Sequence, residues 1–186
     1  MKQEEIFIAG SGGQGVLSAG KILAQTAIQE NKYAIFYPSY GAEIRGGTTN
    51  CTVIISDTEI FSPVIEKFKN MIILNAPSLN KFLNKLSEDG LLIINSSLCE
   101  INQKTLKNIK LLEIPATEIS LKLGDVRCAN IFMLGFYIGI KKILTESNII
   151  QTITNFFEKN KKLVELNIIA FKEGIKKADE LYNKKI

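Results

Sequence analysis

The sequence contains no histidine among its 186 residues. Histidine is the side chain that most often acts as a general base near neutral pH, and it is also the commonest transition-metal ligand. Its absence excludes every catalytic triad that depends on an imidazole. We therefore expect the isolated chain to be inactive, with no catalytic residue assigned within it.

Cysteine is also scarce: Cys51, Cys99 and Cys128 are odd in number and far apart in the sequence. No pair has the C-x-x-C spacing that is typical of zinc ribbons and of many iron–sulfur proteins. The chain alone therefore cannot supply a complete ligand set for a zinc ion or an iron–sulfur cluster. We expect three reduced thiols, and no metal or cofactor held by this chain by itself.

Long apolar runs are missing as well, since none reaches the roughly 18 residues needed to span a bilayer. The N-terminal residues lead directly into a strand-like stretch at 6–9, without the long apolar region of a secretory signal. Hydrophobic residues make up 46% of the chain and charged residues 23%, which is typical of globular proteins. We expect a cytoplasmic chain with one domain over 1–186 and no membrane partner.

The net charge of +4 does not indicate a nucleic-acid partner. Residues 1–140 carry 13 basic and 13 acidic groups, so the excess lies in 141–186, with ten lysines against six acids. Those lysines alternate with apolar residues at helical spacing, as expected of a solvated helix face. A nucleic-acid groove would favour arginine and exposed aromatic residues.

Arginine is the rarer cation, because only Arg45 and Arg127 occur among the 23 basic residues. A chain that otherwise uses lysine is expected to place arginine where a planar fork of five donors is needed. Arg45 lies in a glycine-rich stretch, residues 39–48, between two apolar runs. The pattern predicts a loop between two strands, whose candidate interface or active-site residues are Tyr40, Glu43, Arg45, Gly46 and Gly47.

Two interpretations of this loop remain open. Arg45 and Glu43 could form an ion pair that only fixes the loop, or Arg45 could recognise a carboxylate, a phosphate or an acidic group of a partner.

A second glycine-rich segment follows the first predicted strand. It matches G-x-G-x-x-G between a strand and a helix, the context in which that pattern is meaningful. The helix start would offer free N–H groups to an anion, which makes a candidate phosphate or anion loop of Gly10, Gly12, Gly13, Gln14 and Gly15. A dinucleotide site would also need an acid at the end of the second strand, and residues 33–38 contain none. A merely compact turn is therefore the alternative.

The remaining pattern predicts an α/β fold. Apolar runs predict strands at 5–9, 33–38, 49–56, 70–74, 91–95 and 109–114, and a short strand at 59–62 that pairs with 49–56 as an antiparallel hairpin. Helical spacing predicts helices from Val16 onward and at 78–87, 115–123, 131–143, 146–157 and 161–182. We expect a three-layer Rossmann-like mixed sheet, mostly parallel, in which 5–143 form the core and 144–186 a helical C-terminal tail.

The second arginine lies in the turn 124–130, just before an apolar helix with glycines at 135 and 139. That helix is too short for a membrane span, so its glycines predict close packing on a neighbouring helix. Arg127 and Asn130 join the candidate interface residues.

Taken in order, several motifs resemble the gamma subunit of 2-oxoacid:ferredoxin oxidoreductases. The first are AGSGGQGV at 9–16, SYGAEIRGG at 39–47 and NC at 50–51. Further matches lie at 62–63, 74–78, 95–97, 114–117 and 127–135. The resemblance covers about residues 5–140.

This resemblance implies an accessory role in a complex that oxidatively decarboxylates a 2-oxo acid to an acyl-CoA, with ferredoxin as electron acceptor. Thiamine diphosphate, Mg²⁺, iron–sulfur clusters and coenzyme A would be used by the complex, and the partners would be alpha, beta and delta subunits. The form of the 39–48 loop looks closer to 2-oxoglutarate and branched-chain members than to pyruvate enzymes. The alternatives are a stand-alone nucleotide-binding protein or a scaffold subunit; a homodimer of the isolated chain would also fit.

Overall fold

The computed structural model describes residues 3–40, 47–102, 106 and 108–183. Within them, strands form one sheet in the order β2-β3-β1-β4-β5-β6. The strands are β1 Gln3–Ser11, β2 Tyr33–Tyr40, β3 Thr48–Ser56, β4 Phe68–Ile73, β5 Leu86–Asn95 and β6 Lys110–Ile114. The pairs β1–β4, β4–β5 and β5–β6 are parallel, whereas β3 is antiparallel to both β1 and β2. The predicted mixed, mostly parallel sheet is thus confirmed.

The predicted return strand at 59–62 is wrong. These residues adopt no regular structure, and the antiparallel partner of β3 is β2, with Tyr33 opposite Ser56. Because β3 is paired with β1 along its other edge, neither of its edges is free for a further strand.

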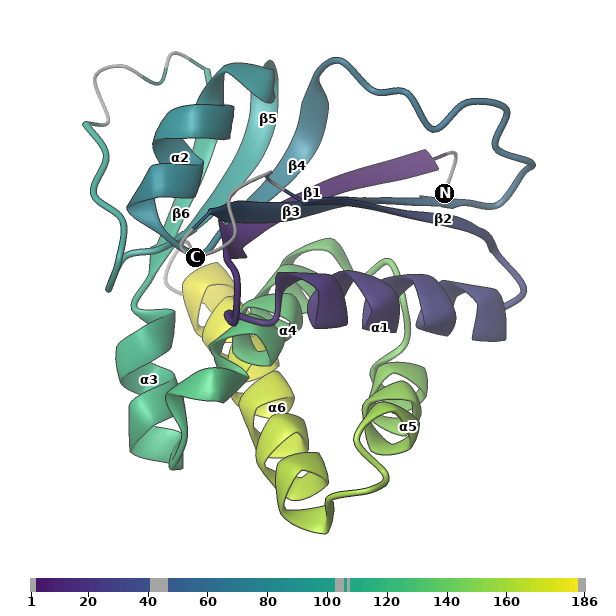
Figure 1. Cartoon of the computed structure of the whole chain (residues 1–186), viewed down its shortest axis with the longest axis vertical. Helices are drawn as coiled ribbons and strands as arrows, with labels where there is room; N and C mark the ends of the chain where they lie inside the picture. Colours follow the sequence, from purple (N-terminus) through teal and green to yellow (C-terminus); the bar gives the residue numbers. More distant parts are fainter. Residues whose placement is uncertain (1–2, 41–46, 103–105, 107, 184–186) are drawn as a thin grey trace.

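Helices cover both faces of the sheet, as Figure 1 shows. The helix α2, Ala76–Phe82, lies on one face and continues as the short 3-10 turn η1, Leu83–Lys85. On the other face lie α1 Val16–Gln29, α3 Ala116–Leu123, α4 Ala129–Lys141, α5 Glu146–Phe156 and α6 Lys161–Asn183. The helix predicted at 78–87 therefore ends early: Leu86 already pairs with Phe68 of β4, and the register then jumps to Asn70 opposite Leu91.

Each face of the sheet has its own apolar core. The larger core joins β-sheet residues such as Ile6 and Ile8 to α1 and α4. The smaller core lies under α2, where the Phe7 ring centroid is 4.8 Å from that of Phe68 and 5.1 Å from that of Phe82. The residues alternate along β1 between the two cores, as the two-residue period of a strand requires.

The C-terminal helix belongs to the larger core. Ala170, Phe171 and Ala178 of α6 are fully buried. A Cβ atom added to Gly135 of α4 would lie 2.1 Å from the backbone oxygen of Phe171, so the two helices approach closely at glycine, as the sequence predicted. Among the residues described, no helix is both long enough and apolar enough to cross a bilayer.

Candidate functional site

The carboxyl ends of β1 and β4 meet at a point where the chain changes faces. The helix that follows β1 lies on one side of the sheet, and the helix that follows β4 lies on the other (Figure 1). In open α/β sheets, the crevice at such a switch point is where ligands generally bind. The candidate site is therefore built from the loops at this edge.

The glycine motif forms a tight turn between β1 and α1. Gly13 has a φ of 90° and Gly15 a φ of 71°, values that favour glycine. The Gln14 side chain folds back, and its Oε1 accepts a hydrogen bond of 2.7 Å from the Ser11 N–H. Gly15 caps α1 without a side-chain hydrogen bond to the helix start. The turn thus satisfies part of its own backbone, which supports the compact-turn interpretation.

Asn130 connects this turn to the start of α4. Its side chain is buried, and Nδ2 donates a hydrogen bond of 2.9 Å to the Gly15 carbonyl. Any Cβ at position 15 would lie 2.4 Å from that nitrogen, so the contact itself requires glycine. Asn130 therefore acts here as a positioning residue for the glycine turn.

Arg127 is held by a local ion pair. Its Nε lies 2.8 Å from Oδ2 of Asp125 and 3.1 Å from Oδ1, and its backbone N–H donates to Oδ1 at 2.8 Å. Hydrogen bonds from Arg127 keep the pKa of the Asp125 carboxyl below its usual range. Asp125 caps the 3-10 turn η3, Val126–Cys128, that precedes α4. These contacts fit the structural interpretation of this arginine, although 74% of its side chain is exposed.

Both sequence-predicted turns border one small hollow. Its volume is about 140 Å³, and its lining includes Gly13, Gly15, Arg127 and Asn130. The 124–130 turn, which carries Arg127, therefore lies beside the glycine motif where α1 begins.

The other glycine-rich stretch begins where β2 ends and finishes where β3 begins. Glu43, Arg45 and Gly46 lie outside the described residues. Tyr40 ends β2. The Gly47 carbonyl accepts a hydrogen bond of 3.5 Å from the Gly12 N–H. This bond places the end of the 39–48 stretch directly beside the glycine turn at the switch point.

Three polar side chains at this edge were missed in the sequence analysis. Asn75 donates from Nδ2 to Ser11 Oγ at 2.5 Å and accepts from the Ser78 N–H at 3.0 Å. Lys81 of α2 donates to Thr48 Oγ1 at 3.0 Å.

Asn95, the third, donates to Thr117 Oγ1 at 2.8 Å and so connects β5 to α3. A usable signal existed for the two asparagines, because each one follows the apolar run of a predicted parallel strand.

The cysteines are separate buried thiols. Burial raises the pKa of Cys51 to about 12 and that of Cys99 to about 12, and it also raises the pKa of Cys128. Thiolate is the form that binds metals and attacks electrophiles, so these environments disfavour both roles. In the described part of the chain, no three His, Cys, Asp or Glu residues gather in a way that could hold a metal ion.

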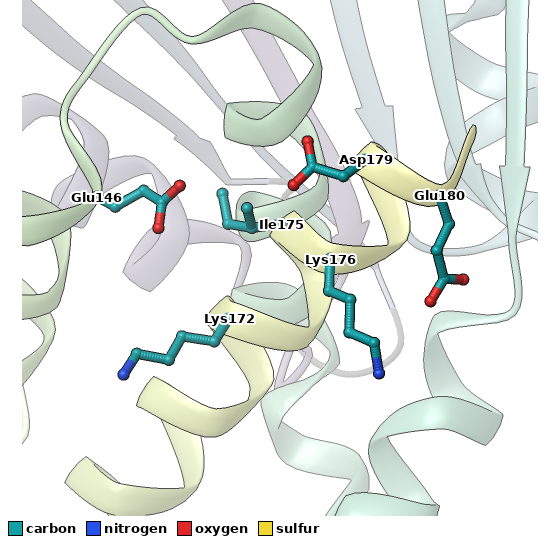
Figure 2. Close-up of a pocket in the computed structure, with 6 residues that line it drawn as sticks. All are labelled: Glu146, Lys172, Ile175, Lys176, Asp179 and Glu180. Atoms are coloured by element: carbon teal, nitrogen blue, oxygen red, sulfur yellow. The ribbon is translucent and has the colours of Figure 1, made fainter. Parts of the chain in front are cut away.

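A larger hollow of about 410 Å³ lies between the start of α5 and the second half of α6. Figure 2 shows that its charged side chains do not converge: the Lys172 and Lys176 ammonium groups point away from the Asp179 carboxylate. It is also remote in sequence from the glycine turns. We therefore place the candidate site at the switch point.

Comparison with known proteins gives a consistent result. A family model described as pyruvate ferredoxin/flavodoxin oxidoreductase matches residues 5–177. The 2-oxoglutarate synthase subunit KorC of Methanocaldococcus jannaschii is 32% identical over 183 residues, which cover 96% of each chain. The gamma subunit of a keto/oxoacid ferredoxin oxidoreductase from Geobacter sulfurreducens PCA has a similar structure, with a TM-score of 0.78 and 28% identity over 94% of this chain and 98% of that one.

A further relative is much longer. The ketoisovalerate oxidoreductase subunit VorA of Methanothermobacter thermautotrophicus is 34% identical over 176 residues, which are 94% of this chain but 36% of the relative. The chain thus spans little more than a third of that protein's length.

Proposed function

The chain belongs to the pyruvate ferredoxin/flavodoxin oxidoreductase family, and from this premise we propose that it is the gamma-type accessory subunit of a 2-oxoacid:ferredoxin oxidoreductase complex. The complex would convert a 2-oxo acid and coenzyme A into an acyl-CoA and CO₂, and it would pass two electrons to ferredoxin. The observation that carries this proposal is the match to KorC, a separate subunit, over almost the whole of both chains.

The proposed substrate is 2-oxoglutarate or a branched-chain 2-oxo acid. Two similar proteins support this choice, because one is named as a subunit of 2-oxoglutarate synthase and the other as a subunit of ketoisovalerate oxidoreductase. The YGAEIRGG form of residues 40–47 supports the same choice.

The residues of this chain do not fit the redox cofactors of such a complex. Its three thiols are buried apart from one another, and it has no histidine. We therefore assign the iron–sulfur clusters to companion alpha, beta and delta subunits, and we assign thiamine diphosphate with its Mg²⁺ to these companions because the family resemblance implies it. Ferredoxin would be reached through the complex, which we place in the cytoplasm.

The contribution of this chain would come from the switch-point edge. The Gly12–Gly47 hydrogen bond fixes one end of the 39–48 stretch beside the glycine turn, and Lys81 holds Thr48 directly after it. We propose that Arg45, carried between these anchors and Tyr40, makes a bidentate contact to a carboxylate of the substrate or of a companion subunit, with Glu43 nearby.

A scaffold role without any contact to substrate is the second candidate. It is favoured by one observation, the Arg127–Asp125 ion pair, which fixes the 124–130 turn and needs no ligand. A stand-alone nucleotide-binding protein has less support. The Gln14 side chain already accepts the Ser11 N–H within the glycine turn, and β2 contains no acidic residue that could bind a ribose.

Substitution of Arg45 by lysine tests the proposed contact, because it keeps the charge and removes the fork. We expect kcat/KM of the purified complex for its 2-oxo acid to fall roughly tenfold or more, with unchanged subunit content. The matched control is Arg127→Lys, which should leave kcat/KM unchanged. If Arg45→Lys changes neither turnover nor subunit association, the special role of Arg45 is wrong.

A further inference from the structure

One half of the α2 side of the sheet has no helix over it. In Figure 1, α2 lies toward the β4–β5–β6 end of the sheet, whereas no helix lies on that side of β2 and β3. Tyr33 and Tyr37 both lie on this side of β2, and they are 51% and 59% exposed. Phe36, between them on the opposite face, packs into the larger core. The exposed tyrosine rings therefore lie on the half of the sheet that no helix covers.

The segment between β3 and β4 adds further apolar surface here. Phe61 is 92% exposed and Val64 is 78% exposed. Val64 and Tyr37 line a common hollow of about 310 Å³, which also reaches Phe7 and Phe68 of the smaller core and Lys85. We use the name open patch for four exposed side chains, Tyr33 and Tyr37 on β2 and Phe61 and Val64 on the segment after β3. Exposed apolar patches of this kind mark interaction sites in folded proteins.

We infer that the open patch is the docking surface for a companion subunit equivalent to the part of the longer ketoisovalerate relative that lies beyond this chain. This inference rests on the proposed function. In that relative, the region similar to this chain is joined to further sequence that makes up the other 64% of the polypeptide (100 − 36). In the longer relative, the matched region is therefore joined to a region of different sequence and not to a second copy of itself. This favours a companion of that kind over a second copy of this chain.

The hollow also indicates what such a companion must bring. An apolar or aromatic side chain that enters beside Val64 would extend the smaller core through Phe7 and Phe68. Lys85 lines the same hollow and could meet a carboxylate of the companion. A buried aromatic anchor with a charged pair at its rim is the usual arrangement of an interface hot spot.

The test is a double variant, Phe61→Ser with Val64→Ser, in the full chain produced in its own host with an affinity tag. The companion is identified by mass spectrometry through similarity to the unmatched part of the longer relative. We expect the amount of that companion per chain to fall about tenfold or more. The matched control is Leu121→Ser with Ile169→Ser, two residues of similar exposure, 66% and 51%, on α3 and α6. The control should retain the companion in full.

Three outcomes separate the ideas. If the unaltered chain brings down no such companion, the proposed function fails. If the unaltered chain and the double variant bring it down equally, and both melt at the same temperature, only the docking surface is wrong. If the isolated chain is a dimer that the double variant converts to a monomer, the patch serves a second copy and the inference is overturned.

Discussion

The two faces of the sheet differ in how completely the chain covers them. On one face of the described sheet lie α1, α3, α4, α5 and α6, and α4 and α6 approach so closely that their glycines touch backbone. On the other face, α2 covers one half, and the rings of Tyr33 and Tyr37 remain exposed on the other. The comparison suggests that the first face stabilises the fold, and that the open half is kept for a partner.

The covered face should show the largest loss on substitution, at Gly135→Ala. Alanine normally stabilises a helix by about 1 kcal/mol relative to glycine. Here its Cβ would lie 2.1 Å from the Phe171 carbonyl oxygen, and backbone cannot move aside cheaply. We expect the free energy of unfolding to fall by about 3 kcal/mol, measured by urea denaturation.

The control for this change is Gly12→Ala at the edge of the sheet. Among the described residues, the added Cβ would meet Thr49 Oγ1 alone, at 3.9 Å, so we expect little change in stability. A Gly135→Ala protein as stable as the parent would show that α6 can shift, and that the covered face is less rigid than its packing indicates.

Tyr137 connects α4 on the covered face to the start of β1. The Tyr137 hydroxyl donates to Glu4 Oε1 at 3.0 Å, and Lys141 Nζ lies 2.7 Å from the same oxygen. Burial, followed by the charge of Glu4, raises the pKa of Tyr137 well above its ordinary value near 10. The pKa of Tyr137 is higher in the folded protein than in the unfolded chain. The stability that the neutral phenol contributes is therefore complete below pH 10 and is lost as the pH rises beyond it.

Tyr137→Phe should therefore lower the free energy of unfolding by about 1 kcal/mol at neutral pH. The difference between the parent and the variant should shrink as the pH rises above 10, measured by denaturant unfolding at a series of pH values. A difference that stays constant to high pH would mean that the buried phenol does not couple to folding.

The sequence predicted the elements that depend on local pattern. Apolar runs located the strands of the sheet, and the glycines at 135 and 139 indicated close helix packing. Both signals can be read within a short segment, because the two-residue period of a strand and the spacing of two glycines involve only residues close in the sequence. The strand predicted at 91–95 begins earlier, at Leu86, and contains an irregularity where its pairing with β4 skips four residues.

Features that depend on distant pairing were not predictable in this way. The return strand at 59–62 failed because the pairing of β3 with β1 was not visible in the sequence. The bond from Asn130 to Gly15 joins residues 115 positions apart. Lys81 at the candidate site gave no local signal either, since only the folding of α2 over the sheet brings it to Thr48.

The smallest effect is expected on the open half, and two positions of β2 on opposite faces offer a matched pair. Tyr33→Thr replaces a ring that is half exposed with a residue that favours strands, so stability should change by less than about 0.5 kcal/mol. Phe36→Thr, on the covered face of the same strand, removes a ring that packs against Gly20 and should cost about 2 kcal/mol or more. Urea denaturation of both proteins measures the contrast directly. Equal losses would mean that the open half already stabilises the isolated chain, and a surface that stabilises the fold in this way would have little left to offer a companion subunit.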